Sequence, residues 1–101
     1  MEENKVLTIE IPEEVTTIVQ KYDIERSSRR DIILYIMQNN INIPEDRFER
    51  YQKEYDEKYF AFETAKGEIE KQYIIPVTGG RKCNWSLDYN SNIITVTLVE
   101  E

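Results

Sequence analysis

The most constraining feature of the 101-residue sequence is one long amphipathic helix, which we predict from Pro44 to about Tyr73. Pro44 suits the first helical position, where the backbone N–H has no partner, and Glu45 and Asp46 suit a first turn that favours negative charge. The Ile74-Ile75-Pro76 step predicts the end, because β-branched residues before a proline favour extended backbone. The apolar positions of this helix recur every three or four residues: Phe48, Tyr51, Tyr55, Tyr59, Phe62, Ala65, Ile69 and Tyr73.

A strand and two shorter helices are predicted before the long helix. Residues 6–11 alternate between apolar and polar side chains, which is typical of a half-buried strand, and Pro12 ends it. Residues 13–22 carry an apolar stripe at helical spacing, and a polar break follows at residues 23–27. Ser28 and Asp31 have the spacing of a capping box, so we expect a second helix over residues 29–39, apolar on nearly all sides.

The C-terminal third of the chain changes to the period of β-structure. Residues 74–78 are predicted to form a short edge strand containing Pro76, and Gly79-Gly80 a turn. Residues 82–89 alternate cleanly, and Asn90-Ser91-Asn92 predicts a hairpin into a last strand over residues 93–99. The predicted fold class is α+β: an N-terminal strand, three helices and a C-terminal antiparallel β-hairpin or meander, with the first strand beside the hairpin.

Length and composition bound the kind of protein. A chain of 101 residues is expected to form a single domain, 1–101. No apolar run is long enough for a membrane span and the N-terminus is acidic, so we expect a cytoplasmic protein without a membrane partner. The net charge of −7 argues against direct binding to nucleic acid. The wealth of Ile, Asn, Lys and Tyr suggests an AT-rich bacterial or phage genome.

The residue types that catalysis and metal binding need are scarce. The chain has no histidine, which removes the commonest general base and metal ligand. Its single cysteine, Cys83, lies on an alternating apolar face, where a small buried hydrophobe is expected. No glycine pattern cradles a phosphate, and no carboxylate spacing matches a calcium loop. We therefore predict no enzymatic activity, no cofactor and no metal.

Three guanidinium groups lie close together at Arg26, Arg29 and Arg30. At a predicted helix N-terminus they would oppose the helix dipole, so an anion or a carboxylate-rich partner surface would suit them. The alternative is that they pair with some of the chain's twenty acidic residues.

Aromatic residues of the long helix are the other candidates for partner binding. Phe60 points about 150° away from the aromatic stripe, onto a charged face, where it would anchor a partner or be covered by the sheet. Tyr55 and Tyr59 lie in the stripe itself, which would form either an interface or part of the protein's own core.

Residues 8–15, Thr-Ile-Glu-Ile-Pro-Glu-Glu-Val, with the two predicted helices up to Met37, resemble the strand-helix-helix order of ribbon-helix-helix repressors. The resemblance covers about a third of the chain and implies a dimer whose strand reads the major groove. The matching outward positions, Val6, Thr8 and Glu10, lack the basic or amide groups of that readout.

These features together predict a small non-catalytic protein–protein interaction module, working as an adaptor, an inhibitor or an assembly component. The expected partner is another protein, or a second copy of the chain in a homodimer. Two alternatives are an acidic inhibitor that imitates nucleic acid to block a basic protein, motivated by the excess of acidic residues, and a ribbon-helix-helix-like DNA-binding dimer.

Overall fold

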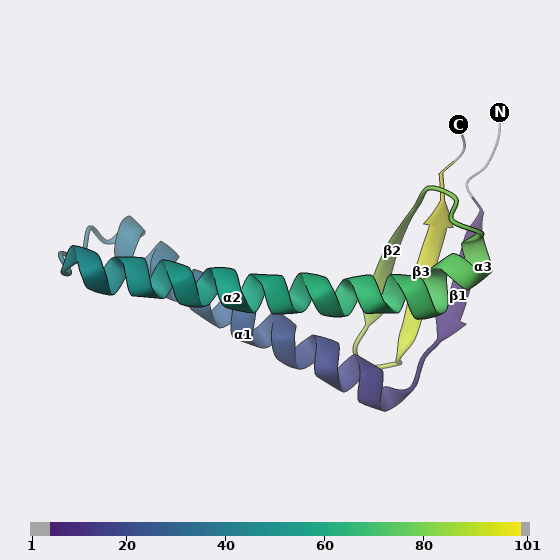
Figure 1. Cartoon of the computed structure of the whole chain (residues 1–101). Helices are drawn as coiled ribbons and strands as arrows, with labels where there is room; N and C mark the ends of the chain where they lie inside the picture. Colours follow the sequence, from purple (N-terminus) through teal and green to yellow (C-terminus); the bar gives the residue numbers. More distant parts are fainter. Residues whose placement is uncertain (1–4, 100–101) are drawn as a thin grey trace. The chain divides into compact units, whose positions relative to one another are not determined.

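The computed structural model describes residues 5–99 and confirms an α+β fold. The elements, in chain order, are β1 (Val6–Glu10), α1 (Glu13–Gln38), α2 (Glu45–Ile69), a π-helical turn η1 (Glu70–Ile74), a single-turn α3 (Ile75–Thr78), β2 (Cys83–Asp88) and β3 (Ile93–Leu98). Two long helices, and not three, precede the C-terminal strands (Figure 1). The described chain divides into two compact units, residues 19–65 and the residues on either side of them.

The three strands of the first unit form an antiparallel sheet in the order β1-β3-β2, with β3 in the middle (Figure 1). The prediction that the first strand lies beside the C-terminal hairpin is confirmed. Leu7 and Trp85 both pair with Val96, and Ile9 and Leu87 both pair with Ile94. Apolar residues from the three strands therefore share one face of the sheet.

The core of this unit lies on that apolar face. Its buried hydrophobic residues in the sheet are Ile94, Val96 and Leu98, whereas Thr95 between them is exposed. The helical segments contribute Ile69 and Ile74, also buried, and Ile11 follows directly on β1. A hydrogen bond from Trp85 Nε1 to Glu70 Oε1, 3.1 Å long, joins β2 to η1.

The predicted break at residues 23–27 is wrong, because α1 runs without interruption from Glu13 to Gln38. The capping box at Ser28 is consequently absent, and Ser28 lies in the middle of the helix. The polar residues of this stretch have partners within a helical geometry: Arg26 bonds to Asp23 at i, i+3, and Glu25 pairs with Lys58 of α2. The polar residues that predicted a loop therefore form part of the charged contact between α1 and α2.

The predicted strand at residues 74–78 is also wrong, since these residues are helical. After Ile69 the chain makes the π-helical turn η1, and Pro76 then occupies a position in the first turn of α3. A proline in a continuous helix removes one hydrogen bond and clashes with the carbonyl four residues earlier. A π-helical turn is one of the irregularities that allow a helix to accommodate such a residue. Gly79, in the left-handed conformation with φ 67°, ends the helix.

The second unit is a helical hairpin, formed by the parts of α1 and α2 within residues 19–65 (Figure 1). The predicted start of the long helix is confirmed, because the Pro44 carbonyl accepts hydrogen bonds from the N–H groups of Arg47 and Phe48. The connecting residues 39–44 include Asn40, whose φ of 50° is left-handed, a conformation that asparagine tolerates. Below we call this unit the hairpin.

Candidate interaction surface

The hairpin has no closed core of its own. Between residues 20 and 65, all of which the structure describes, no residue is buried; the side chains between the helices are at best partly covered. The first unit, by contrast, buries hydrophobic residues from its sheet and its helical segments. Two helices side by side shield only one stripe of each, so the remaining apolar surface stays in water.

The exposed apolar surface of the hairpin is large. Phe60 is 73 % exposed, Tyr35 61 % and Met37 60 %. Further exposed hydrophobic residues of the hairpin are Ile24, Ile32, Leu34, Ile41 and Tyr59. Single exposed hydrophobic residues are common on protein surfaces, but this many on one 47-residue unit, in which only Val19 at its boundary is buried, is typical of an interaction surface.

One edge of the hairpin is joined by ion pairs between the helices. Arg29 Nε lies 3.5 Å from Glu54 Oε2, and Lys58 Nζ lies 3.2 Å from Glu25 Oε2. The four side chains are 30–42 % exposed, so each pair contributes no more than about 1 kcal/mol to the stability of the fold. The pairs fix the alignment of α1 against α2 on this edge.

The other side of the hairpin is a shallow groove, which we call the groove face. It is defined by Ile33, Leu34 and Met37 of α1 and by Phe48, Gln52 and Tyr55 of α2. Leu34 and Met37 are three residues apart and Phe48 and Gln52 four, so on each helix they lie one turn apart on the same face.

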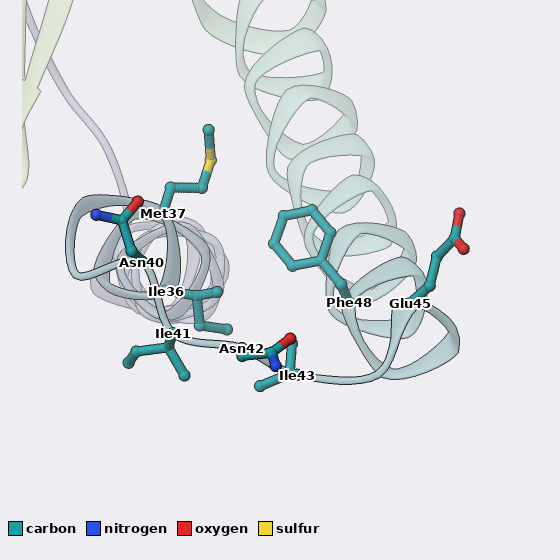
Figure 2. A pocket seen from close by; sticks show the side chains of 8 residues that line it. All are labelled: Ile36, Met37, Asn40, Ile41, Asn42, Ile43, Glu45 and Phe48. Carbon is teal, nitrogen blue, oxygen red and sulfur yellow. The ribbon is translucent and has the colours of Figure 1, made fainter.

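Two hollows lie along the groove face. The first, of about 480 Å³, is at the end of the hairpin, and apolar side chains predominate among those that line it: Ile36, Met37, Ile41, Ile43 and Phe48, with Asn40, Asn42 and Glu45. Figure 2 shows the Phe48 ring turned toward α1 and the Glu45 carboxylate pointing away from it. The chemistry of this hollow suits an apolar side chain of a protein partner.

The second hollow, of about 430 Å³, lies further along the same groove. Arg30, Ile33 and Leu34 line it from α1, and Gln52, Tyr55 and Asp56 line it from α2. It therefore has an apolar floor with a cation on one helix and a carboxylate on the other. Tyr59 continues the groove, since its ring centroid lies 6.0 Å from that of Tyr55.

The three arginines predicted as a cluster have different partners. Arg26 bonds to Asp23 and its guanidinium carbon lies 4.8 Å from the centroid of the Phe62 ring, and Arg29 pairs with Glu54. The hydrogen bond to Asp23 raises the pKa of Arg26 above its ordinary value, against the opposing effect of desolvation. Only Arg30 lines the groove, with Asp31 Oδ1 3.7 Å from its Nε.

The predicted anion site at these arginines required a helix N-terminus. The structure has none there, because α1 runs through all three residues. The side chains of two successive residues in a helix point about 100° apart. Arg29 therefore lies on the edge with the ion pairs, whereas Arg30 lines the groove. Whether Arg26, Arg29 and Arg30 contact a partner stays a prediction.

Phe60 does not contribute to either hollow of the groove face. It follows Tyr59 by one residue, which turns its side chain about 100° further around α2, and it is the most exposed of the large hydrophobic residues described. Sequence reasoning identified Tyr55, Tyr59 and Phe60 but missed Leu34, Met37 and the hollow at the end of the hairpin. The apolar run at residues 32–37 was the signal for the first two.

A third hollow belongs to the first unit, where η1 and α3 meet β2. Glu70 and Ile74 line it from η1, and Cys83 and Trp85 from β2. Glu70 already accepts the hydrogen bond from Trp85 Nε1, so the carboxylate of this hollow is engaged within the protein. Cys83 is partly buried in the sheet, as an apolar residue of an alternating strand would be.

Comparisons of the chain with protein families, with curated proteins and with solved structures find no match. Among residues 5–99, no group of three or more Cys, Asp or Glu side chains is arranged to hold a metal ion. No helix in that part of the chain is both long and apolar enough to cross a membrane.

Proposed function

We propose that the protein is a non-catalytic protein–protein interaction module that binds its partner through the groove face of the hairpin. The observation that carries this proposal is the absence of any buried residue over residues 20–65, together with the exposed apolar residues Leu34 and Met37 that line the groove face. A helix in a protein gains most of its stability from packing its apolar face. A partner on the groove supplies the packing that the hairpin lacks.

The composition of the groove face supports this function. Aromatic residues and methionine are enriched at protein interfaces, and Phe48, Tyr55, Tyr59 and Met37 lie along the groove. Tyrosine buries a large area with few rotatable bonds and keeps a hydrogen-bonding hydroxyl at its tip. The polar residues at the margins, among them Arg30, Gln52 and Asp56, resemble the polar rim of an interface.

The two alternative functions have less support. Imitation of nucleic acid needs a continuous acidic surface, but Glu25 and Glu54 are engaged in ion pairs with Lys58 and Arg29. A ribbon-helix-helix dimer needs a strand that pairs across two chains and two helices after it. Here β1 pairs with β3 of the same chain, and a single helix, α1, follows.

A photo-crosslinking residue at position 37 tests the proposed function. Met37 borders the first hollow, so a benzophenone amino acid in its place is expected to give one dominant adduct, in purified protein or in lysate of the native host. The control is the same residue at position 53, because Lys53 is exposed and lines neither hollow. Equal adducts from both positions, or none from either, would refute the proposal.

A further inference from the structure

Resting on the proposed function, we infer that the partner of the groove face is a second copy of this chain, so that two hairpins form a four-helix bundle. The inference commits to one arrangement. The two-fold axis runs parallel to the helices and through the second hollow, and α1 of each copy packs on α2 of the other. Every helix in this bundle has antiparallel neighbours, as in the simplest four-helix bundles.

The dimensions of the hairpin suit this bundle. Residues 19–38 of α1 and 45–65 of α2 form two antiparallel helices, each about 30 Å long at 1.5 Å per residue. Helices that pack about 10 Å apart present a face of roughly 600 Å² in projection, and the accessible area of a corrugated face is larger. A stable interface buries about 800 Å² on each partner, which is of the same order as one groove face.

The charges of the groove are complementary to themselves. Arg30 and Asp56 line the same hollow from opposite helices. Arg30 has only the adjacent Asp31 at 3.7 Å, and no ion pair involves Asp56 among the described residues. A two-fold axis through the hollow exchanges the two sides, which places Arg30 of each copy against Asp56 of the partner subunit. One hollow thereby gives two intermolecular ion pairs.

The distribution of charge along the chain also favours a second copy over a strongly charged partner. Residues 19–65 contain eight basic and ten acidic side chains, so the hairpin is nearly neutral. The remainder of the chain has five basic and ten acidic side chains and carries most of the net charge of −7. Self-association through the hairpin avoids much of the like-charge repulsion that association through the other unit would meet.

A mixing experiment with two charge-reversal variants tests the inference. The full chain is purified as wild type, Arg30→Glu and Asp56→Arg, and the mass of each in solution is measured by sedimentation equilibrium. In either variant alone, both intermolecular pairs become repulsive, so the dimer dissociation constant is expected to rise by at least about tenfold. In an equimolar mixture, both pairs become attractive again, and a heterodimer with an affinity near that of the wild type is expected.

Rescue in the mixture distinguishes the proposed interface from a folding defect, because an ion pair within one chain cannot form by mixing. Leu34→Glu is expected to abolish the dimer, since it places a charge in the apolar floor of the hollow. Tyr35→Ser is the matched control: Tyr35 is exposed, is the next residue on α1 and lines neither hollow. Its dissociation constant is expected to stay within about threefold of wild type.

Three results would overturn the second-copy inference: a monomeric wild type at about 100 µM, variants that dimerise as well as wild type, or a mixture without heterodimer. The crosslinking experiment separates this failure from failure of the proposed function. A monomeric protein that still crosslinks specifically from position 37 to a different protein keeps the function and loses the second copy. A monomeric protein without any specific adduct loses both.

Discussion

At the scale of single residues, local hydrogen bonds and ion pairs fix geometry that the residue types alone leave open. The Asp88 carboxylate accepts a hydrogen bond of 2.9 Å from the N–H of Asn90 and so closes the turn between β2 and β3. In the hairpin, Arg26 is only 16 % exposed and lies between Asp23 and the Phe62 ring. Both residues act within the fold, and neither lines the groove.

The hydrogen bonds of Asp88 make the stability of the turn depend on pH. The Asn90 N–H, with smaller contributions from Ser91, holds the pKa of Asp88 below its ordinary value of 3.8. A carboxyl group whose pKa is lower in the folded than in the unfolded protein stabilises the fold at any pH above its unfolded-state pKa. This stabilisation is lost as the pH falls through the folded-state pKa. We expect wild type to lose more stability than Asp88→Asn when the pH falls from about 6 to about 3.

Urea unfolding followed by circular dichroism at both pH values measures this difference. Asparagine retains an oxygen that can accept the Asn90 hydrogen bond but does not titrate, which makes it the matched variant. Asp88→Ala, which removes the acceptor, is expected to lower the urea midpoint at the higher pH as well. The same pH dependence in wild type and Asp88→Asn would refute this account of the turn.

At the scale of elements, the polar stretch within α1 is helical although its local sequence favours a loop, because its charged residues pair with the neighbouring helix. Residues 23–29 contain four charged residues and two serines, a composition that favours loops and caps when only the local sequence is considered. In the structure, Glu25 and Arg29 face Lys58 and Glu54 of α2. The helix continues because its charges are paired across the hairpin.

Ser28→Ala distinguishes a continuous α1 from two helices that meet at Ser28. Ser28 is exposed in the middle of α1, where alanine has the higher helix propensity, so the substitution is expected to raise the free energy of unfolding by about 0.5 kcal/mol. At an N-cap, the same substitution would lower it by about 1 kcal/mol. The sign of the change in urea unfolding decides between the two, and Ser28→Pro, expected to cost about 3 kcal/mol, serves as the disruptive control.

At the scale of the whole molecule, stability is expected to be uneven between the two units. Ile94 and Val96 of β3 are fully buried, whereas the hairpin contains no buried residue between residues 20 and 65. Backbone amides in segments with few buried contacts open more readily. The hairpin is therefore the part whose order depends most on a partner.

Hydrogen exchange at two protein concentrations measures this dependence. Amides of β3 are expected to exchange slowest at both concentrations. If two hairpins associate, exchange of amides in residues 20–65 is expected to slow by at least about tenfold between about 1 µM and about 200 µM protein, because binding stabilises the folded form by mass action. Exchange of the hairpin that does not depend on concentration would contradict the second-copy inference. The amides of β3 are the internal control.

Much of this fold follows from local patterns. Alternation placed the strands to within one or two residues, and the Pro44-Glu45-Asp46 start gave the beginning of α2. The aromatic spacing identified Tyr55 and Tyr59, which lie on the groove side of the hairpin. These signals are reliable because they report interactions within a few residues of chain, such as capping, the direction of successive side chains and the period of burial.

Other features were decided by contacts between segments distant in the sequence. Arg29 and Glu54 are 25 positions apart, and only their pairing shows that the polar stretch around them is helical. The π-helical turn before Pro76 coincides with the packing of Ile69, Ile74 and Trp85 in the first unit, and no local pattern at Pro76 predicts it. The groove face likewise depends on the tertiary structure, in which Leu34 of α1 and Tyr55 of α2 line one hollow. The sequence shows which residues of a helix share a face, but it does not show which face the neighbouring helix leaves uncovered.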